Sequence, residues 1–182
     1  MKFETCNIEG LVICKPKIIS DKRGFFTETF RKDLFDNFNG EISSFCQTNC
    51  SESIYGTIRG LHFQISPSSQ SKLVSVQSGE ILDVVLDLRR NSKTFGKYFS
   101  KLLNDINNYQ FFIPSGFAHG FSVLSNKARV QYMVDNFYDK KNEFGINPLD
   151  ENLNIDWKVK DPIISKKDIA NPNFDKNQHY NF

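Results

Sequence analysis

Apolar and polar residues alternate along most of this chain, and this period of two constrains its fold more than any other feature. In residues 81–89, ILDVVLDLR, every second position from Leu82 to Leu88 is leucine or valine, whereas Asp83 and Asp87 fall on the opposite side. Such a strand has one face suited to a core and one face with polar groups in the middle of a sheet. The pattern therefore predicts β-structure at this point of the chain.

Other short segments also have strand-like patterns and are separated by glycine, proline, asparagine or serine. They span residues 11–19, 24–30, 42–49, 72–79, 95–103, 110–116 and 128–138. A helix is favoured only over residues 31–38. Many short strands at regular spacing are typical of an all-β jelly-roll sandwich or barrel, here with a few short helices.

The chain length of 182 residues favours one domain, because single domains commonly have roughly 100–200 residues. No linker or internal repeat divides the sequence, so we expect a single jelly-roll domain over residues 1–182. Its last part, residues 171–182, is polar with scattered aromatic residues. We interpret it as a tail that is either packed down or frayed.

Positive and negative side chains nearly cancel, since 23 Lys and Arg residues against 21 Asp and Glu residues leave a net charge of +2. This balance excludes a nucleic-acid-binding protein that works by bulk positive charge. No apolar run approaches the roughly 20 residues needed to cross a bilayer, and the N-terminus is too polar for a signal peptide. We therefore expect a cytoplasmic protein with neither a nucleic-acid nor a membrane partner.

The four cysteines, Cys6, Cys14, Cys46 and Cys50, do not have the spacing of a zinc site. If residues 46–50 form a strand, the last two cysteines are roughly 13 Å apart, which is too far for a disulfide. We expect reduced and mostly buried thiols.

The chain has three histidines, and two of them are candidates for a functional site. His179 lies in the polar tail and is expected to be idle. His62, in RGLHFQ, and His119, in PSGFAHGF, lie among small or apolar residues with ionisable neighbours close in sequence. One histidine in such a segment is more often a core residue with its hydrogen bonds made inside the protein than a catalytic residue. Two of them beside strand-end glycines favour a site.

The segment PSGFAHGF contains the pattern PxGxxH, which resembles the second motif of the cupin superfamily of small β-barrels. Cupin metal sites usually take two further histidines from an HxH pair and a glutamate. This chain has only His62 in the earlier region, and two histidines without an obvious third ligand make a weak metal site. We therefore expect a barrel pocket that works without a metal.

A more specific resemblance extends from about Gly10 to Pro172. It rests on the runs DKRGFFTETF (21–30), FCQTNCSES (45–53), GTIRGLHFQ (56–64), SKLVSVQSGEILDVVLDLRRNSKTFG (71–96), IPSGFAHGF (113–121) and SKKD (165–168). In order and spacing these runs resemble the dTDP-4-dehydrorhamnose 3,5-epimerase family. The resemblance implies a cupin-like jelly roll, a homodimer that exchanges N-terminal strands, and no metal or other cofactor. It also implies a nucleotide-linked 4-keto-6-deoxy sugar as substrate, in the biosynthesis of bacterial surface polysaccharide.

The implied reaction has clear chemical requirements. A ketone at C4 acidifies the hydrogens at C3 and C5, because the carbanion delocalises into an enolate. Epimerisation then needs a base on one face of the sugar, a proton donor on the other face, and a group that stabilises the enolate oxygen. The reaction needs no redox cofactor, and the chain has no glycine-rich dinucleotide fingerprint.

Four residues match the catalytic positions of the family. His62 matches the base, and Asp168 matches the carboxylate that fixes its tautomer and stabilises the imidazolium. Tyr132 matches the proton donor on the opposite face, and Lys72 matches the residue that stabilises the enolate. Without the resemblance, Asp168 would be interpreted as a helix or turn cap, Tyr132 as an ordinary strand residue and Lys72 as a surface lysine.

Other residues match substrate-binding positions. Arg23, Phe26 and Glu28 match an N-terminal segment that contacts the nucleotide, across the dimer. Further matches are Gln47, Asn49, Arg59, His119, Phe137 and Tyr138, of which Arg59 offers a fork for phosphate oxygens and Phe137 a ring that stacks on a base. Strict alternation places Arg59 opposite His62, so both line one pocket only if the strand bulges or bends at Gly60.

The chain departs from the family where the base and sugar are expected to be recognised. Pro148, Leu149 and Asp150 stand where the family usually has a sequence close to Trp-Asn-Asp. This departure leaves open a dTDP-hexose or another nucleotide sugar, including a GDP-linked 4-keto-heptose. The motifs do not distinguish inversion at C3 and C5 from inversion at C3 alone. The alternatives are a 3,4-ketoisomerase of the same substrate class and a non-catalytic sugar- or metal-binding cupin. The joint presence of His62, Lys72, Tyr132 and Asp168 favours the epimerase over both.

Overall fold

The structure is a computed structural model that describes residues 1–39 and 44–182. The predicted helix over residues 31–38 is confirmed as α1 (Lys32–Asn39). A second short helix, α2 (Lys166–Ile169), includes Asp168 but was not predicted by its range. Residues 42–43 of the predicted strand over 42–49 lie outside the described residues. The strands of the described residues are β1 (Lys2–Thr5), β2 (Val12–Lys15), β3 (Ile18–Asp21), β4 (Gly24–Thr27), β5 (Gln47–Ile54), β6 (Thr57–Gln64), β7 (Lys72–Ser78), β8 (Glu80–Asp87), β9 (Tyr98–Asn104), β10 (Gln110–Ile113), β11 (Phe117–Val123), β12 (Lys127–Val134), β13 (Glu143–Gly145) and β14 (Ile163–Ile164).

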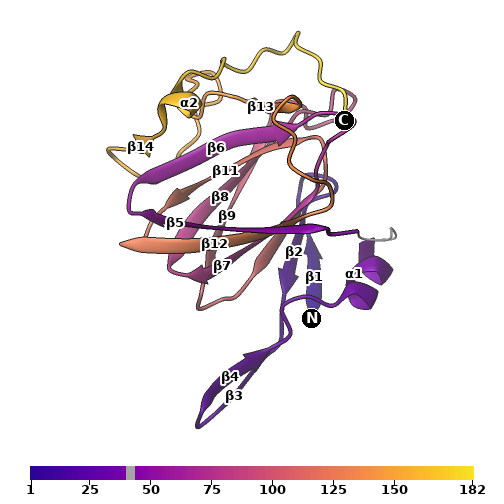
Figure 1. The fold of residues 1–182 in the computed structure, drawn as a ribbon, viewed down its shortest axis with the longest axis vertical. Coiled ribbons are helices and arrows are strands. Elements are labelled where there is room, and N and C mark those ends of the chain that lie inside the picture. The colour runs from indigo at the N-terminus through magenta and orange to yellow at the C-terminus, as the bar shows by residue number, and fades with distance from the viewer. Residues whose placement is uncertain (40–43) are drawn as a thin grey trace.

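Two sheets face each other and confirm the predicted all-β jelly roll (Figure 1). The first sheet has the strand order β1-β2-β10-β7-β12-β5, and the second has the order β13-β6-β11-β8-β9, with β14 paired in parallel to β6. Val85, Phe111 and Phe121 belong to the apolar cluster that fills the space between the sheets. No helix in the described part of the chain is long and apolar enough to cross a membrane.

Strand β8 is buried on both faces, so the prediction that one face is polar is wrong for most of its length. Ile81 and Val85 pack in the core between the sheets. Val84 and Leu86, on the other face, pack in a second cluster with Trp157 of the C-terminal segment. That segment forms an additional layer over the outer face of the second sheet, which the alternation of β8 does not indicate.

Asp83 and Asp87 of β8 have different surroundings, although neither is exposed to solvent. Asp87 accepts hydrogen bonds from the Arg89 guanidinium at 2.8 and 2.9 Å and from the hydroxyls of Ser92 and Thr94, both at 2.6 Å. Burial favours the neutral carboxyl group, but these hydrogen bonds outweigh burial and hold the pKa of Asp87 below its usual value. Asp87 therefore stabilises the turn after β8, whereas Asp83 contacts His119.

Strand β6 has the predicted irregularity at Gly60. The pairing of β6 with β11 changes register between the pairs His62–His119 and Arg59–Phe121. Gly60 has a φ of +133°, and a Cβ atom on it would lie 2.5 Å from the Cα atom of Gly120. The bulge is therefore possible only with glycine, and it allows Arg59 and His62 to line the same cavity.

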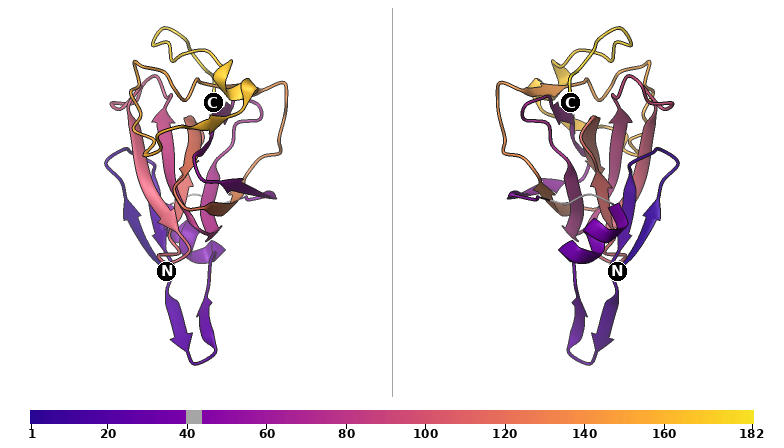
Figure 2. Two further views of the ribbon diagram at one scale, coloured as in Figure 1. Left: turned by 90° about the vertical axis from the view of Figure 1, so that its left-hand side faces the viewer. Right: turned by 90° about the vertical axis from the view of Figure 1, so that its right-hand side faces the viewer.

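Strands β3 and β4 form a hairpin that projects away from both sheets (Figure 2). The two strands pair with each other, and the side chains of Ile19, Phe25 and Phe26 are 55%, 59% and 68% exposed. An isolated two-stranded hairpin with apolar side chains in water is marginally stable at best. The hairpin thus has an unburied apolar surface within the single chain.

The C-terminal tail packs onto the end of β6. The rings of Tyr180 and Phe182 lie 4.7 and 5.9 Å from the ring of Phe63, centroid to centroid. The backbone amide of Ser66 donates a hydrogen bond of 2.7 Å to the carbonyl of Asn181. The tail therefore lies against β6 and is packed down rather than frayed.

Two of the four thiols are not buried, contrary to the expectation of mostly buried cysteines. Cys14 is buried and Cys6 is half-buried, whereas Cys46 and Cys50 are exposed. All four are free. Burial raises the pKa of Cys14 to about 12.

Candidate active site

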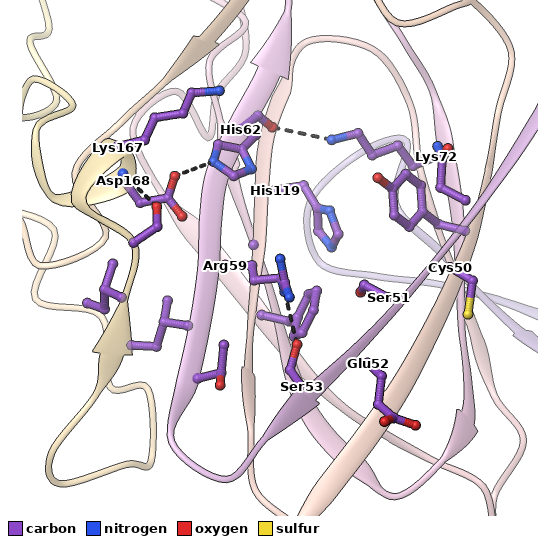
Figure 3. Close-up of a pocket in the computed structure, with 18 of the residues that line it drawn as sticks. Cys50, Ser51, Glu52, Ser53, Arg59, His62, Lys72, His119, Lys167 and Asp168 are labelled. Atoms are coloured by element: carbon purple, nitrogen blue, oxygen red, sulfur yellow. Dashed lines mark hydrogen bonds and ion pairs between the residues drawn. The ribbon is translucent and has the colours of Figure 1, made fainter.

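A cavity of about 840 Å³ lies against strands of both sheets and helix α2. It brings together residues that are far apart in sequence, as Figure 3 shows for part of its wall. The predicted site residues that line it are Gln47, Asn49, Arg59, His62, Lys72, His119, Tyr132, Tyr138 and Asp168. These residues include all four of the predicted catalytic positions.

His62 and Asp168 form a hydrogen-bonded pair. Nε2 of His62 lies 2.7 Å from Oδ1 of Asp168, and Ser165 caps helix α2 by accepting a hydrogen bond from the Asp168 amide. Burial raises the pKa of Asp168, but the contact with His62 and the weak bond from the Gly60 amide outweigh burial and lower it. An ionised Asp168 accepts a hydrogen bond from Nε2–H of His62, which leaves Nδ1 of His62 as the basic nitrogen.

Lys72 is not an ordinary surface lysine. Its side chain reaches across from β7, and Nζ donates a hydrogen bond of 3.3 Å to the backbone carbonyl of His62. Burial lowers the pKa of Lys72 to about 8, against the opposing attraction of Asp83 and Glu143. The Lys72 ammonium group therefore lies in the same cavity as the His62 imidazole, with few protein groups to compete with a ligand for its hydrogen bonds.

Tyr132 and His62 come from opposite sheets. Tyr132 lies on β12 of the first sheet and His62 on β6 of the second. Burial raises the pKa of Tyr132, although the positive charge of Arg59 opposes this change. The phenol is thus protonated at neutral pH, as a proton donor must be.

Arg59 brings a fixed positive charge to the cavity. Its Nε atom donates a hydrogen bond of 2.9 Å to the Ser53 hydroxyl on β5. Three lysines also line the cavity. Of these, Lys127 and Lys167 pair with Glu52 and Glu143. Among the described residues, Arg59 has no carboxylate partner, so its terminal nitrogens are available to an anionic ligand.

Glu143 and Lys167 also line the cavity, although the sequence interpretation did not single them out. Oε2 of Glu143 accepts hydrogen bonds from the Tyr138 hydroxyl at 2.9 Å and from Nζ of Lys167 at 2.6 Å. The bond to Glu143 raises the pKa of both Tyr138 and Lys167. Glu143 begins β13, and no motif marked it in the sequence. Lys167 directly precedes Asp168 in SKKD, which was a weak signal.

Four predicted binding residues do not line the cavity of their own chain. Arg23 pairs with Asp21 at the tip of the β3–β4 hairpin, Phe26 is exposed on the same hairpin, and Glu28 follows β4. Phe137 is 65% exposed. In the single chain, the structure therefore does not bring these residues to the site.

The segment Pro148–Asp150 also lies outside the cavity. The carbonyl of Pro148 accepts a hydrogen bond of 2.8 Å from the Trp157 indole, and Asp150 accepts one of 2.7 Å from the Phe174 amide. In this chain the segment anchors the C-terminal layer. Within the described residues, no group of three or more His, Cys, Asp or Glu side chains could hold a metal ion.

Comparison with known proteins identifies the family of this sequence and fold. The sequence model for dTDP-4-dehydrorhamnose 3,5-epimerase matches residues 5–176. A relative of that name from Shigella flexneri is 44% identical over 167 residues, which are 92% of each chain. The match thus extends over both sheets and the cavity.

Two solved structures have the same fold. One is the dTDP-6-deoxy-D-glucose-3,5-epimerase RmlC from Legionella pneumophila in complex with dTDP-4-keto-L-rhamnose. The TM-score between this structure and that epimerase is 0.90 at 42% identity, over 94% of this chain and 92% of the other. The other is ChmJ, a 3'-monoepimerase from Streptomyces bikiniensis in complex with dTDP-quinovose. The TM-score between this structure and ChmJ is 0.87 at 32% identity, over 92% of this chain and 85% of the other. On the family match and the extent of these similarities, the chain belongs to the dTDP-4-dehydrorhamnose 3,5-epimerase family.

Proposed function

We propose that this protein is an epimerase that inverts C3 and C5 of a nucleotide-linked 4-keto-6-deoxy sugar. The observation that carries the proposal is the placement of a histidine–carboxylate pair, His62 and Asp168, in one cavity with Lys72 and with Tyr132 of the opposite sheet. This set supplies a base, a group that stabilises an oxyanion, and a proton donor.

In the proposed reaction, Nδ1 of His62 removes a proton from the carbon next to the C4 ketone. The electron pair of the broken C–H bond forms a double bond to C4. The π electrons of the C4 carbonyl move to its oxygen, and the Lys72 ammonium stabilises the resulting enolate oxyanion. The Tyr132 hydroxyl then gives its proton to the opposite face of the same carbon. Tyr132 regains a proton from water, and His62 releases its proton to water.

The nucleotide is most simply dTDP. The Legionella and Streptomyces structures contain dTDP-sugars, and the segment Pro148–Asp150, whose sequence left a GDP-heptose open, lies outside the cavity. ChmJ, which has the same fold, is a 3'-monoepimerase, and this supports inversion at C3 alone as the second candidate. The 44% identity to a 3,5-epimerase, against 32% to ChmJ, favours inversion at both carbons.

We further propose a cytoplasmic homodimer of single-domain chains that acts in the synthesis of deoxysugars for bacterial surface polysaccharide. The exposed apolar β3–β4 hairpin and the position of Arg23, Phe26 and Glu28 outside their own cavity support this assembly. In an exchanged dimer, the hairpin would bury its apolar side chains against a second copy and bring these residues to the second cavity.

Incubation with dTDP-4-keto-6-deoxy-D-glucose in deuterated water tests the function. We expect NMR to detect deuterium at C3 and C5 together with inverted products. Label at C3 alone would favour the monoepimerase, and no exchange with dTDP- or GDP-linked 4-keto sugars would contradict the proposal. His62→Asn should abolish exchange, whereas the matched control His179→Asn, in the exposed tail, should retain it.

A further inference from the structure

A fully buried carboxylate lies beside the cavity, and the proposed reaction does not use it. Asp83 is 0% exposed, and both of its carboxylate oxygens lie 3.0 Å from Nε2 of His119. His119 itself is buried and lines the cavity. A buried carboxylate is costly unless a specific partner compensates for its lost hydration, so this contact needs a structural or functional reason.

The contact determines which imidazole nitrogen carries the proton. An ionised carboxylate can only accept hydrogen bonds, so Nε2 of His119 must be the donor. Burial lowers the pKa of His119, and the nearby charges of Lys72 and His62 lower it further, although Asp83 opposes this change. The ring therefore holds one proton at neutral pH, and Nδ1 has a free lone pair.

The second nitrogen of His119 is accessible. In residues 1–39 and 44–182, the buried side-chain nitrogen and oxygen atoms without a partner are Oε1 of Gln110 and Nδ2 of Asn171. Nδ1 of His119 has no hydrogen bond to these residues and is not in that group. Because His119 lines the cavity and lies between His62 and Lys72 (Figure 3), Nδ1 is available to a ligand there.

We propose that Asp83 is a positioning residue that fixes His119 in the Nε2–H tautomer, so that Nδ1 accepts a hydrogen bond from a sugar hydroxyl. The choice of a sugar rests on the proposed function, whereas the tautomer does not. A free lone pair repels a carbonyl or enolate oxygen and attracts an O–H group. His119 therefore recognises a hydroxyl next to the reacting carbons, and Lys72 stabilises the oxyanion.

Nitrogen NMR of the full-length, ¹⁵N-labelled protein at neutral pH tests the tautomer directly. The three imidazoles are assigned by loss of signals in His62→Asn, His119→Asn and His179→Asn. We expect His119 to have a protonated Nε2 and an unprotonated Nδ1. A protonated Nδ1, or protons on both nitrogens, would overturn the proposal, since Asp83 would then be a donor or His119 a cation.

The variant Asp83→Asn tests whether the carboxylate is responsible. An amide of the same size can donate or accept, so we expect the His119 nitrogens to shift toward a mixture of tautomers. An unchanged Nε2–H tautomer in this variant would overturn the role of Asp83. If the variant does not fold, the spectrum of the wild-type protein still decides which tautomer is present.

Kinetics then test whether Asp83 acts through His119. We expect Asp83→Asn to lower kcat/KM about tenfold in the wild-type background and to have little effect in a His119→Ala background. Equal losses in both backgrounds would show a general structural role and contradict the proposal. Asp156→Asn, on the exposed surface, is the control. If the wild-type protein epimerises no 4-keto sugar, the proposed function fails, but the tautomer measurement still decides the role of Asp83.

Discussion

His62 and His119 are direct cross-strand partners on β6 and β11, and Nε2 of each lies within 3.0 Å of a different carboxylate. Asp168 reaches His62 from helix α2, and Asp83 reaches His119 from β8. One cavity thus contains two imidazoles whose Nδ1 atoms are available. His62 is half-buried and His119 is buried, so His62 has more room to exchange protons with substrate and water.

The carboxylate of Asp168 should be essential to the base. In Asp168→Asn the amide no longer requires Nε2 of His62 to be the proton donor, and it does not stabilise the imidazolium. We expect kcat for epimerisation to fall at least about 100-fold, measured by deuterium incorporation. Asp161→Asn, outside the cavity, should have activity close to that of the wild-type protein. An Asp168→Asn enzyme with nearly normal kcat would contradict this assignment.

Loss of the Tyr132 hydroxyl should separate exchange from inversion. In Tyr132→Phe, His62 still removes the proton, but the opposite face has no positioned donor, so the proton returns to the original face. We expect deuterium exchange to continue at one carbon while inverted product falls. The two rates are compared by NMR and chromatography in the same reaction. Tyr98→Phe, on β9, is a matched control, and equal loss of exchange and inversion would mean that Tyr132 acts earlier.

The charge on Lys72 should limit activity at alkaline pH. Because the pKa of Lys72 is lowered to about 8, the ammonium is present below that pH and is lost as the pH rises through it. We expect kcat to decrease above this value. In Lys72→Arg the residual activity should lack this decrease, since guanidinium stays protonated. Lys93→Arg, an exposed control, should retain the wild-type profile, and a decrease that persists in Lys72→Arg would assign it to another group.

The lowered pKa of Lys72 affects stability in the opposite direction from activity. Between the lowered pKa of Lys72 and its usual value near ~10.4, the unfolded chain binds more protons than the folded chain. The contribution of Lys72 to the free energy of unfolding therefore rises with pH in that interval. Activity and stability should thus change in opposite directions above the lowered pKa.

Ser53 should orient Arg59 for the anionic part of the substrate. Ser53→Ala removes the acceptor of the Nε–H bond, which should raise KM about tenfold with little change in kcat. Ser53→Thr should restore most of the affinity because it keeps the hydroxyl. Ser51→Ala, two residues earlier in the same cavity wall, is the control. An unchanged KM, or the same loss in an Arg59→Lys background, would refute this role.

The exchanged hairpin can be tested by mixing inactive subunits. Arg23→Ala removes a residue that should act in the second copy's cavity, and His62→Asn removes the base of its own cavity. If hairpins are exchanged, unfolding and refolding a mixture of the two variants should restore part of the activity, since some hybrid sites contain neither substitution. Each variant treated alone is the control. No recovery in a mixture proven to contain hybrid dimers would contradict the exchange.

Local sequence patterns predicted the β-rich fold because the period of two and the turn residues are properties of neighbouring positions. They did not predict that β8 is buried on both faces, since the covering layer includes Trp157, far along the chain. Likewise, His62 and Asp168 are 106 positions apart and only the family resemblance joined them. The Glu143–Lys167 pair was missed because a salt bridge between distant segments leaves no periodic signal.

The bulge at Gly60 was predictable because it resolves a conflict between alternation and the need for Arg59 and His62 in one pocket. The need for a second glycine at position 120, opposite the bulge, was not predictable, because the close approach of two backbones depends on how the strands pair. A Cβ atom on Gly120 would lie 2.6 Å from the Arg59 carbonyl, just as one on Gly60 would collide with Gly120. For an engineer who redesigns this cavity for other sugars, the two glycines are therefore coupled positions, and neither tolerates a side chain.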